Sequence, residues 1–243
     1  MIWIVGGTSE GDYFSKKLKE IPHIITLGTK EGLEYYSGKN YQYKRMTLED
    51  MVDFIEKENI NTVVDLSHPF AVNVSNNAKK ASEKRKIPYF RYEREVTELG
   101  KNSIEFKSYE ECFEYLKTWE GTLFLTTGSN RAEDFEKVRK ENRFVYRVLP
   151  MVESVEKLKN LNKNIKDIVA MVGPFTKELD KEIYKFYKVD GVVMKDSGKA
   201  GGTREKILAC EELKIKSFVI TRENKEMGEF SEFVEKFLEN YKN

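Results

Sequence analysis

The sequence predicts an α/β protein whose mainly parallel sheets are divided between two halves. Short apolar runs alternate with segments of helical periodicity along all 243 residues, which is typical of parallel strands joined by helical crossovers. One polar stretch without periodicity, Glu93–Lys101, interrupts this alternation and indicates a domain boundary. Glycine and hydroxyl residues follow several of the apolar runs, where open α/β sheets bind their ligands. We therefore expect one domain over residues 1–95 and a second over residues 96–243.

The first half should contain a sheet with helices between its strands. Strands are expected at Ile2–Val5, Ile24–Leu27, Tyr41–Lys44, Thr62–Asp65 and Pro88–Arg91. Helices are expected at Gly11–Glu20, Leu48–Glu58 and Ala71–Lys86. In the last of these, small residues recur at helical spacing, so this helix can lie close to a sheet.

The second half repeats the alternation. Strands are expected at Ser103–Phe106, Thr122–Leu125, Phe144–Arg147, Ile168–Met171, Gly191–Met194 and Phe218–Ile220. Helices are expected at Tyr109–Trp119, Ala132–Lys140, Val155–Leu161, Lys177–Phe186, Arg204–Leu213 and Glu229–Tyr241. Phe230, Phe233 and Phe237 lie on one face of the final helix, so it should pack on a core, and we assign it to the second domain.

Composition narrows the function classes. The chain has 42 Lys and Arg against 41 Asp and Glu, so no overall field favours nucleic acid or an anionic membrane. No apolar run is long enough to span a bilayer, and no leader precedes the first strand, so we expect a cytoplasmic protein. Cys112 and Cys210 lack neighbouring ligand residues, which favours reduced, buried thiols and gives no metal site.

The first apolar run ends in Gly6-Gly7-Thr8-Ser9-Glu10. Glycines allow a sharp turn and close approach of a ligand, and the helix that follows offers unpaired N–H groups to a phosphate. This strand, turn and helix therefore predict a nucleotide site. The segment departs from the G-x-G-x-x-G pattern, and a tight turn without a ligand is the alternative.

Three further segments follow strands at the predicted carboxyl edges. They are Asp65–Phe70, Thr126–Ser129 and Lys195–Thr203. In the last, glycines could form an anion nest beside Lys195 and Lys199, whereas the alternative is a polar loop in which Thr203 caps the next helix. Thr176, after Gly173 and Pro174, is expected to cap a helix in the same way.

His68 follows a strand directly and is a candidate for substrate contact or proton transfer. The alternative is a hydrogen-bonded structural histidine. No serine has a histidine and an aspartate partner at a recognisable spacing, so hydrolase chemistry is poorly supported.

The end of the second strand indicates the cofactor. NAD-selective folds usually place a carboxylate there, but this chain has Thr29 and Lys30 after Gly28. A hydroxyl and an ammonium suit a 2′-phosphate, so we expect NADPH rather than NADH. An ordinary exposed lysine is the alternative.

Taken together, these motifs closely resemble the precorrin-6A reductase family of corrin-ring (cobalamin) biosynthesis, including its cobalt-precorrin-6A reductases. The matching segments are Gly6–Glu10, Val64–Ala71 with Asn76 and Ala78, Ile87–Arg91, Leu125–Gly128, Arg147–Pro150, Gly173–Phe175, Lys195–Gly198 with Lys206 and Ile207, and Ile220–Arg222. They span nearly the whole chain. Two departures are Glu223 after Arg222, where the family has proline, and Ser129-Asn130 before Arg131. These departures affect the expected carboxylate contacts rather than the family.

The resemblance implies two Rossmann-like halves with an interdomain cleft, in which NADPH reduces one ring double bond of a polycarboxylate macrocycle. Enzymes of the same pathway would be the partners. The implied cofactor contacts are Gly6, Gly7, Thr8, Ser9, Glu10, Thr29 and Lys30, with Ser67, His68, Thr127 and Gly128 added. The implied macrocycle contacts are Arg91, Arg131, Arg147, Asp196, Ser197, Lys199, Gly201 and Thr203. Lys195 is expected to stabilise developing charge, and Lys195, His68 and water remain open as proton donors.

Two rival interpretations remain. A short-chain or epimerase-type NADPH oxidoreductase needs a Tyr-x-x-x-Lys pair, and Tyr184 with Lys188 has that spacing. It lacks the partner serine at the usual strand end. A nucleotide-sensing module that binds without catalysis is the other alternative.

Overall fold

The computed structural model describes residues 1–30, 32–36, 38–222 and 228–242. The chain divides into two compact units. Unit 1 consists of Met1–Glu95 and Lys225–Asn243, and unit 2 of Val96–Asn224. Each unit is built on one sheet in which the described strand pairs are all parallel.

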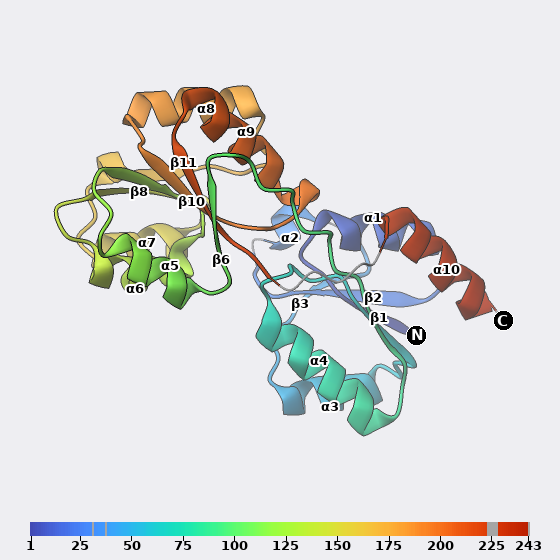
Figure 1. The fold of residues 1–243 in the computed structure, drawn as a ribbon. Coiled ribbons are helices and arrows are strands. Elements are labelled where there is room, and N and C mark those ends of the chain that lie inside the picture. The colour runs from blue at the N-terminus through green and yellow to red at the C-terminus, as the bar shows by residue number, and fades with distance from the viewer. Residues whose placement is uncertain (31, 37, 223–227, 243) are drawn as a thin grey trace. The chain divides into compact units, whose positions relative to one another are not determined.

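Unit 1 has a five-stranded sheet in the order β3-β2-β1-β4-β5. Figure 1 labels β1, β2 and β3 of this sheet. Its strands are β1 (Ile2–Val5), β2 (His23–Leu27), β3 (Tyr41–Tyr43), β4 (Thr62–Asp65) and β5 (Tyr89–Arg91). Val5 lies opposite both Thr26 and Asp65. The residues that follow β1 and β4 therefore leave the sheet side by side.

Helices cover both faces of this sheet. They are α1 (Ser9–Leu18), the short α2 (Gly32–Tyr35), α3 (Leu48–Lys57), α4 (Val72–Arg85) and α10 (Phe230–Lys242). Ile2 and Ile4 pack with Phe14 of α1, whereas the alternating residues Trp3 and Val5 pack on the α3 and α4 side. This alternation follows from the two-residue period of a strand and produces three layers.

The placement of α10 differs from the expected domain division. Val234 and Phe237 are buried in the core formed by β1, β2, β4 and α1, and the ring of Phe237 lies 5.1 Å from that of Phe14. The helix therefore belongs to unit 1, and the expectation that residues 96–243 form one domain is corrected. An apolar stripe predicts that a helix packs on a core, but it does not identify which core.

Unit 2 has a six-stranded sheet in the order β6-β11-β10-β7-β8-β9. Its strands are β6 (Ser103–Phe106), β7 (Thr122–Leu125), β8 (Arg143–Val148), β9 (Ile168–Ala170), β10 (Gly191–Lys195) and β11 (Lys216–Ile220). Strands β7 to β11 repeat the order found in unit 1. The sixth place is taken by β6, which precedes the others in the chain, because the segment after β11 returns to unit 1.

In unit 2, α8 (Lys177–Tyr187) and α9 (Thr203–Leu213) cover one face of the sheet. Figure 1 shows α5 (Tyr109–Leu116), α6 (Ala132–Val138) and α7 (Val152–Asn160) on the other face. Short 3-10 turns occupy Ser129–Arg131, Ile165–Asp167 and Lys199–Gly201. Tyr184 and Cys210 pack against Phe124 in the core beneath α8 and α9.

The α/β fold with two mainly parallel sheets confirms the predicted class. Each expected strand and helix is present with its ends displaced by a few residues, while α2 and the 3-10 turns were not anticipated. Thr176 caps α8 as expected by accepting a hydrogen bond from the Leu179 N–H. Cys112 and Cys210 are both buried free thiols. Among the described residues, no helix is long and apolar enough to cross a membrane.

Candidate functional site

Each sheet has one point where its connections change direction. In unit 1 the chain runs from β1 through β2 to β3 and then returns to β4 on the other side of β1. In unit 2 the same reversal separates β7 from β10. Ligands of open α/β sheets bind beyond the carboxyl ends of such strand pairs. The four segments singled out in the sequence follow these four strands, which makes both edges candidate binding sites. That the two edges share one cleft stays a prediction.

Residues 6–8, here called the Gly6 turn, are shaped by two glycines. A Cβ at Gly6 would lie 2.6 Å from Cγ2 of Ile25, so no larger residue fits. Gly7 has φ of +108°, and a Cβ there would meet nothing within 4 Å. The backbone at Gly7 is therefore both glycine-dependent and open to a ligand. The start of α1 adds unpaired N–H groups, and this donor set fits the diphosphate of a dinucleotide.

Thr8 joins the Gly6 turn to the segment after β4. Its hydroxyl accepts a hydrogen bond from the Gly11 N–H at 3.4 Å and donates one to the Leu66 carbonyl at 2.6 Å. The first contact caps α1, and the second spans the point where the connections reverse. Thr8 therefore fixes the width of the crevice rather than offering its hydroxyl to a ligand.

A small hollow lies at this crevice, lined by Thr8, Glu10, Leu66, Ser67, Pro69, Tyr92 and Arg94. The Glu10 carboxylate receives two 2.6 Å hydrogen bonds from the Arg94 guanidinium. Burial alone would raise the pKa of Glu10, but the bonds and charge of Arg94 outweigh it and lower the pKa. Ser9 donates to the same carboxylate at 3.1 Å. The sequence did not predict Arg94, because it lies in the aperiodic stretch Glu93–Lys101 and its partner Glu10 is 84 residues away in the chain.

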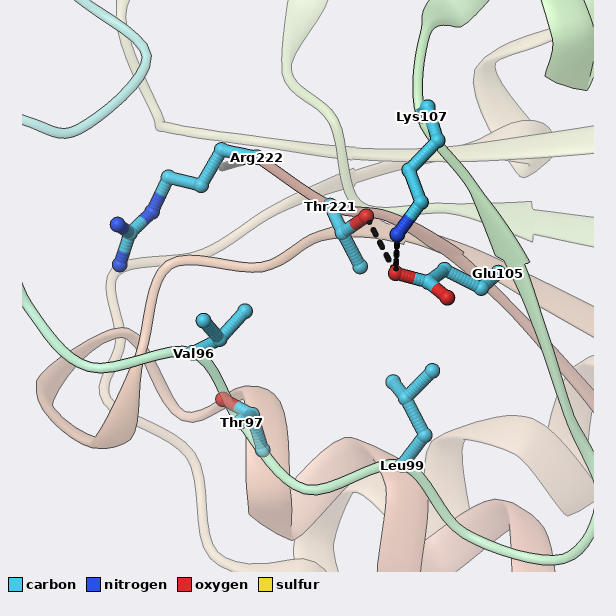
Figure 2. A pocket seen from close by; sticks show the side chains of 7 residues that line it. All are labelled: Val96, Thr97, Leu99, Glu105, Lys107, Thr221 and Arg222. Atoms are coloured by element: carbon cyan, nitrogen blue, oxygen red, sulfur yellow. Dashed lines mark hydrogen bonds and ion pairs between the residues drawn. The ribbon is translucent and has the colours of Figure 1, made fainter. Parts of the chain in front are cut away.

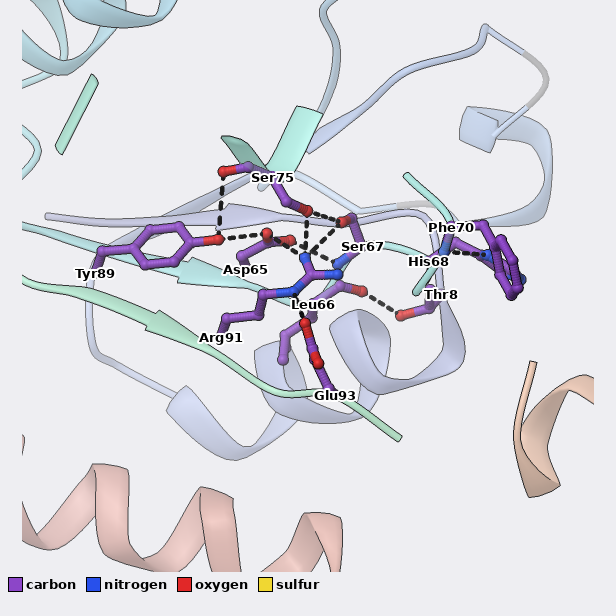
Figure 3. A network of polar contacts seen from close by, with 10 residues as sticks. All are labelled: Thr8, Asp65, Leu66, Ser67, His68, Phe70, Ser75, Tyr89, Arg91 and Glu93. Carbon is purple, nitrogen blue, oxygen red and sulfur yellow. Dashed lines mark hydrogen bonds and ion pairs between the residues drawn. The ribbon is translucent and has the colours of Figure 1, made fainter. Parts of the chain in front are cut away.

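Asp65 and Arg91 form the centre of a buried network (Figure 3). Asp65 is fully buried, and its carboxylate accepts hydrogen bonds from the Ser67 N–H at 3.0 Å and the Tyr89 hydroxyl at 2.7 Å. Arg91 donates to Asp65, Ser67 and Ser75. Burial would raise the pKa of Asp65, but the Arg91 charge and these hydrogen bonds lower it.

The network gives Arg91 partners within unit 1. Nε of Arg91 also bonds to Glu93 at 2.8 Å, and the side chain is only 14% exposed. Nε and Nη1 of Arg91 thus bond within unit 1, where Arg91 holds Ser67, an expected cofactor contact, in place. The expected contact of Arg91 with the macrocycle stays a prediction.

His68 and the end of β2 are less enclosed. Nδ1 of His68 accepts a hydrogen bond from the Phe70 N–H at 3.2 Å, which supports the turn after β4. The Thr29 hydroxyl accepts one at 3.2 Å from the N–H of Gly32, the first residue of α2. Lys30 is exposed, with its ammonium 5.9 Å from the ring centre of Tyr43. Catalysis by His68 and phosphate binding by Lys30 stay predictions.

In unit 2, the turn after β7 has the same features as the Gly6 turn. Gly128 has φ of +84°, and a Cβ there would meet nothing within 4 Å. The Thr127 side chain is 4% exposed, and its hydroxyl has no hydrogen-bond partner among the residues that the structure describes. A buried hydroxyl without a partner is costly. Thr127 and Gly128 therefore fit the expected role in ligand binding.

The segment after β10, here called the Lys195 turn (residues 195–202), is held from within. Asp196 is fully buried and accepts hydrogen bonds from the Thr97 N–H and hydroxyl and from the Gly198 N–H, at 2.7 to 3.0 Å. Thr203 is also fully buried; its hydroxyl accepts from the Ser197 N–H at 3.0 Å and contacts the Lys195 carbonyl. Both residues shape the turn, so their expected contact with the macrocycle is corrected. Thr203 does not cap α9 either, because Gly202 occupies that position.

The remaining residues of the turn differ in exposure. Lys199 is exposed, while burial of the Lys195 side chain lowers the pKa of its ammonium. Ser197 is 9% exposed. The Gly201 N–H bonds to the Gly198 carbonyl at 3.1 Å. Lys195 and Lys199 thus remain the cations that this turn can present.

The two expected arginine contacts of unit 2 have partners in the chain. Arg147 bonds to Asp180, with side chains 4% and 1% exposed, and its guanidinium lies 4.0 Å from the ring centre of Phe175. Arg147 is therefore a core residue, and its expected contact with the macrocycle is corrected. Arg131 bonds to Asp134 at 3.1 Å but keeps 47% of its side chain exposed, so its charge remains accessible.

Unit 2 also contains a cavity of about 550 Å³ that the sequence did not indicate. It is lined by Val96, Thr97, Leu99, Glu105, Lys107, Thr221 and Arg222 (Figure 2). Lys107 and Thr221 both donate to the Glu105 carboxylate. The cavity lies at the carboxyl ends of β6 and β11 and carries both apolar and cationic side chains.

The Tyr-x-x-x-Lys interpretation is wrong. Tyr184 is 1% exposed and packs inside the core beneath α8. Lys188 ends that helix in the left-handed conformation. A tyrosine enclosed in this way cannot reach a substrate. Within the described part of the chain, no group of three or more His, Cys, Asp or Glu residues could hold a metal ion.

Comparisons with known proteins agree with these features. The family model "Precorrin-6x reductase CbiJ/CobK" matches residues 1–239. A cobalt-precorrin-6A reductase of Priestia megaterium is 36% identical over 94% of this chain and 92% of its own length. One of Methanocaldococcus jannaschii is 32% identical over 90% of this chain and 89% of its own length. A solved structure of CobK precorrin-6A reductase has a TM-score of 0.78 at 19% identity, over 99% of this chain and 96% of that chain. At that identity, the likeness shows a shared fold.

Proposed function

The chain belongs to the precorrin-6x reductase family, and from this premise we propose that it uses NADPH to reduce one ring double bond of cobalt-precorrin-6A. Membership makes it an oxidoreductase of cobalamin biosynthesis that uses a nicotinamide cofactor and a macrocyclic substrate. The choice of the cobalt-containing macrocycle over precorrin-6A rests on the names of the relatives that are 36% and 32% identical.

The Gly6 turn carries the proposal. Its open backbone at Gly7 and the start of α1 provide N–H donors for a dinucleotide diphosphate. Thr8 and the Arg91 network hold this turn and the segment after β4 at a fixed separation. A site fixed in this way loses little entropy of its own when it binds a cofactor.

NADPH is proposed over NADH because of Thr29 and Lys30. Both follow β2, where the adenosine ribose of a bound dinucleotide lies in folds of this kind. Lys30 is exposed and can move from Tyr43 to a phosphate at small cost. Its ammonium would then bind the 2′-phosphate, which NADH lacks.

A bound reduced nicotinamide would supply the hydride. The chain must then bind the macrocycle, stabilise its developing charge and provide one proton. We propose that three cations bind the carboxylates. Lys199 and Arg131 have exposed side chains, and Lys195 lies on the same turn as Lys199. Because burial lowers the pKa of Lys195, its ammonium releases a proton more readily than an exposed lysine does. Lys195 is therefore the proposed stabilising group and the first candidate donor, with His68 and water as the others.

The experiment follows NADPH absorbance during incubation with cobalt-precorrin-6A, precorrin-6A or no macrocycle. The proposal predicts NADPH consumption that depends on the macrocycle and is faster with the cobalt form. Binding of NADPH without consumption would instead indicate the nucleotide-sensing alternative.

Lys195→Ala is expected to lower kcat by at least about a hundredfold, the usual contribution of one electrostatic or proton-transfer group. It should leave the Kd for NADPH almost unchanged. Lys166→Ala removes an exposed lysine outside the candidate site and serves as the matched control. Unchanged turnover in Lys195→Ala would exclude the proposed role.

A further inference from the structure

We propose that Lys206 is a positioning residue whose ammonium holds the Lys195 turn in the shape that binds the macrocycle. The inference rests on the proposed function, because it assigns a task to a turn that is proposed to contact the substrate. It concerns a residue that does not itself reach the ligand. Lys206 lies in the second turn of α9 and is 8% exposed.

The hydrogen bonds of the Lys206 ammonium point toward the turn. Its Nζ donates one hydrogen bond to the Gly201 carbonyl and one to the Gly202 carbonyl, both at 2.9 Å. Bonds from a charged donor are shorter and roughly twice as strong as neutral ones. The lysine therefore fixes two successive peptide groups of the turn from beneath.

Fixing these carbonyls also orients the opposite ends of the same peptide groups. The C=O and N–H of one peptide unit point in opposite directions. When the Gly202 carbonyl faces Lys206, the Thr203 N–H must face away from it, at the start of α9. The Gly202 carbonyl also accepts the backbone N–H of residue 206 at 3.4 Å, so it keeps one partner when the side chain is replaced, whereas the side-chain bond to the Gly201 carbonyl is lost. Lys206 thus maintains the donor face of the turn.

The charge on Lys206 is balanced by its surroundings. The charged and titratable groups that face it are Arg147 on β8, Asp180 on α8, Asp196 after β10, and Glu205 and Cys210 on α9. Burial, assisted by Arg147, lowers the pKa of Lys206 to about 8, and the three carboxylates oppose this shift. The ammonium is therefore charged at neutral pH and loses its charge over a range that an assay can reach.

A buried ammonium is an expensive way to fill space in a core. Methionine has a similar length and would fill the same volume beside α8 without a charge. If Lys206 served packing alone, Lys206→Met would change neither the turn nor the substrate affinity. The two carbonyl contacts distinguish this possibility from the proposed one.

The test measures hydrogen exchange in the Lys195 turn of the full chain. The amides of Gly201 and Gly202 are suitable reporters because they bond to the Gly198 and Lys199 carbonyls. Lys206→Met is expected to raise their exchange rates about tenfold, the effect of losing one net hydrogen bond. Lys216→Met, at an exposed lysine of β11, is the matched control and should leave them unchanged.

Steady-state kinetics then test whether the shape of the Lys195 turn affects macrocycle binding. Lys206→Met should raise KM for the macrocycle about tenfold, with a smaller change in kcat and none in the Kd for NADPH. Between pH 7 and 9, wild-type KM should rise as Lys206 loses its proton. Lys206→Arg keeps its charge throughout, so it should restore the low KM and remove the part of the pH dependence that Lys206 contributes.

Unchanged exchange of Gly201 and Gly202 in Lys206→Met would overturn the proposal, whatever the activity. Faster exchange with an unchanged macrocycle KM would show that Lys206 stabilises the turn, but it would overturn the proposed role in positioning the turn for the macrocycle. A wild-type protein that reduces no macrocycle would contradict the proposed function. The exchange data would still decide whether Lys206 holds the turn.

Discussion

Replacing Arg147 by methionine is expected to destabilise unit 2 rather than to weaken macrocycle binding. The substitution leaves the Asp180 carboxylate, which is fully buried, without its counter-charge. It also removes the guanidinium from the face of Phe175. The effect should therefore appear in the free energy of unfolding, although the sequence alone indicated a substrate contact.

The size of the effect follows from the burial of the pair. Removing one partner of a buried ion pair costs about 3 to 5 kcal/mol. In a unit of this size, a loss of 1 kcal/mol lowers Tm by about 4 °C. Arg147→Met should therefore lower the Tm of unit 2 by about 12 to 20 °C. Replacing both charges, in Arg147→Met with Asp180→Leu, should recover most of this loss because apolar pairs can replace buried ion pairs.

The assay is thermal unfolding followed by circular dichroism, with KM for the macrocycle measured well below Tm. We expect a large fall in Tm for the single variant, a small fall for the double variant, and a KM near that of the wild type. An unchanged Tm together with a raised KM would refute the reasoning. A double variant as unstable as the single one would refute it as well.

Three other substitutions test separate parts of the site. Gly7→Ala should weaken NADPH binding about tenfold in a fluorescence titration, because its Cβ would project into the open space where the diphosphate is proposed to lie; Gly28→Ala, which lies outside the proposed cofactor contacts, should not. Lys30→Ala should raise KM for NADPH about tenfold and leave KM for NADH unchanged. An equal rise in KM for both cofactors would exclude the proposed contact of Lys30 with the 2′-phosphate. The pKa of Asp65 is lower in the folded than in the unfolded chain, so its stabilisation is present above about pH 4 and is lost as the pH falls through the folded pKa. Urea unfolding of Asp65→Asn should therefore show lower stability at pH 7 and a smaller further loss at pH 3 than the wild type, and equal losses would contradict the assigned network.

The strands, the helices and the turns at the carboxyl ends of the strands could be predicted because their signals are local. Apolar runs identified the strands, and the glycines and hydroxyl residues after β1, β4, β7 and β10 identified the reversal points of both sheets. Gly7 and Gly128 have the positive φ values that such turns require. The residues that make up each feature are close together in the sequence, so each feature can be recognised without knowing a distant partner.

The residues whose expected roles were corrected have partners that are distant in sequence. Arg147 pairs with Asp180, and Asp196 binds Thr97. A cationic or acidic residue after a strand can bind a ligand or its own chain, and the sequence does not distinguish these cases. Lys206 shows the reverse: it lies within a matching motif, but its contact with the Gly201 carbonyl appears only in three dimensions.

The most direct test of the central claim is the fate of the hydride. The protein is incubated with cobalt-precorrin-6A and NADPH that carries two deuterium atoms at nicotinamide C4, and the macrocycle is analysed by mass spectrometry. Reduction by direct transfer predicts a macrocycle that gains one deuterium for each NADPH consumed. A reduced macrocycle without deuterium, or an unreduced macrocycle beside intact NADPH, would contradict the account.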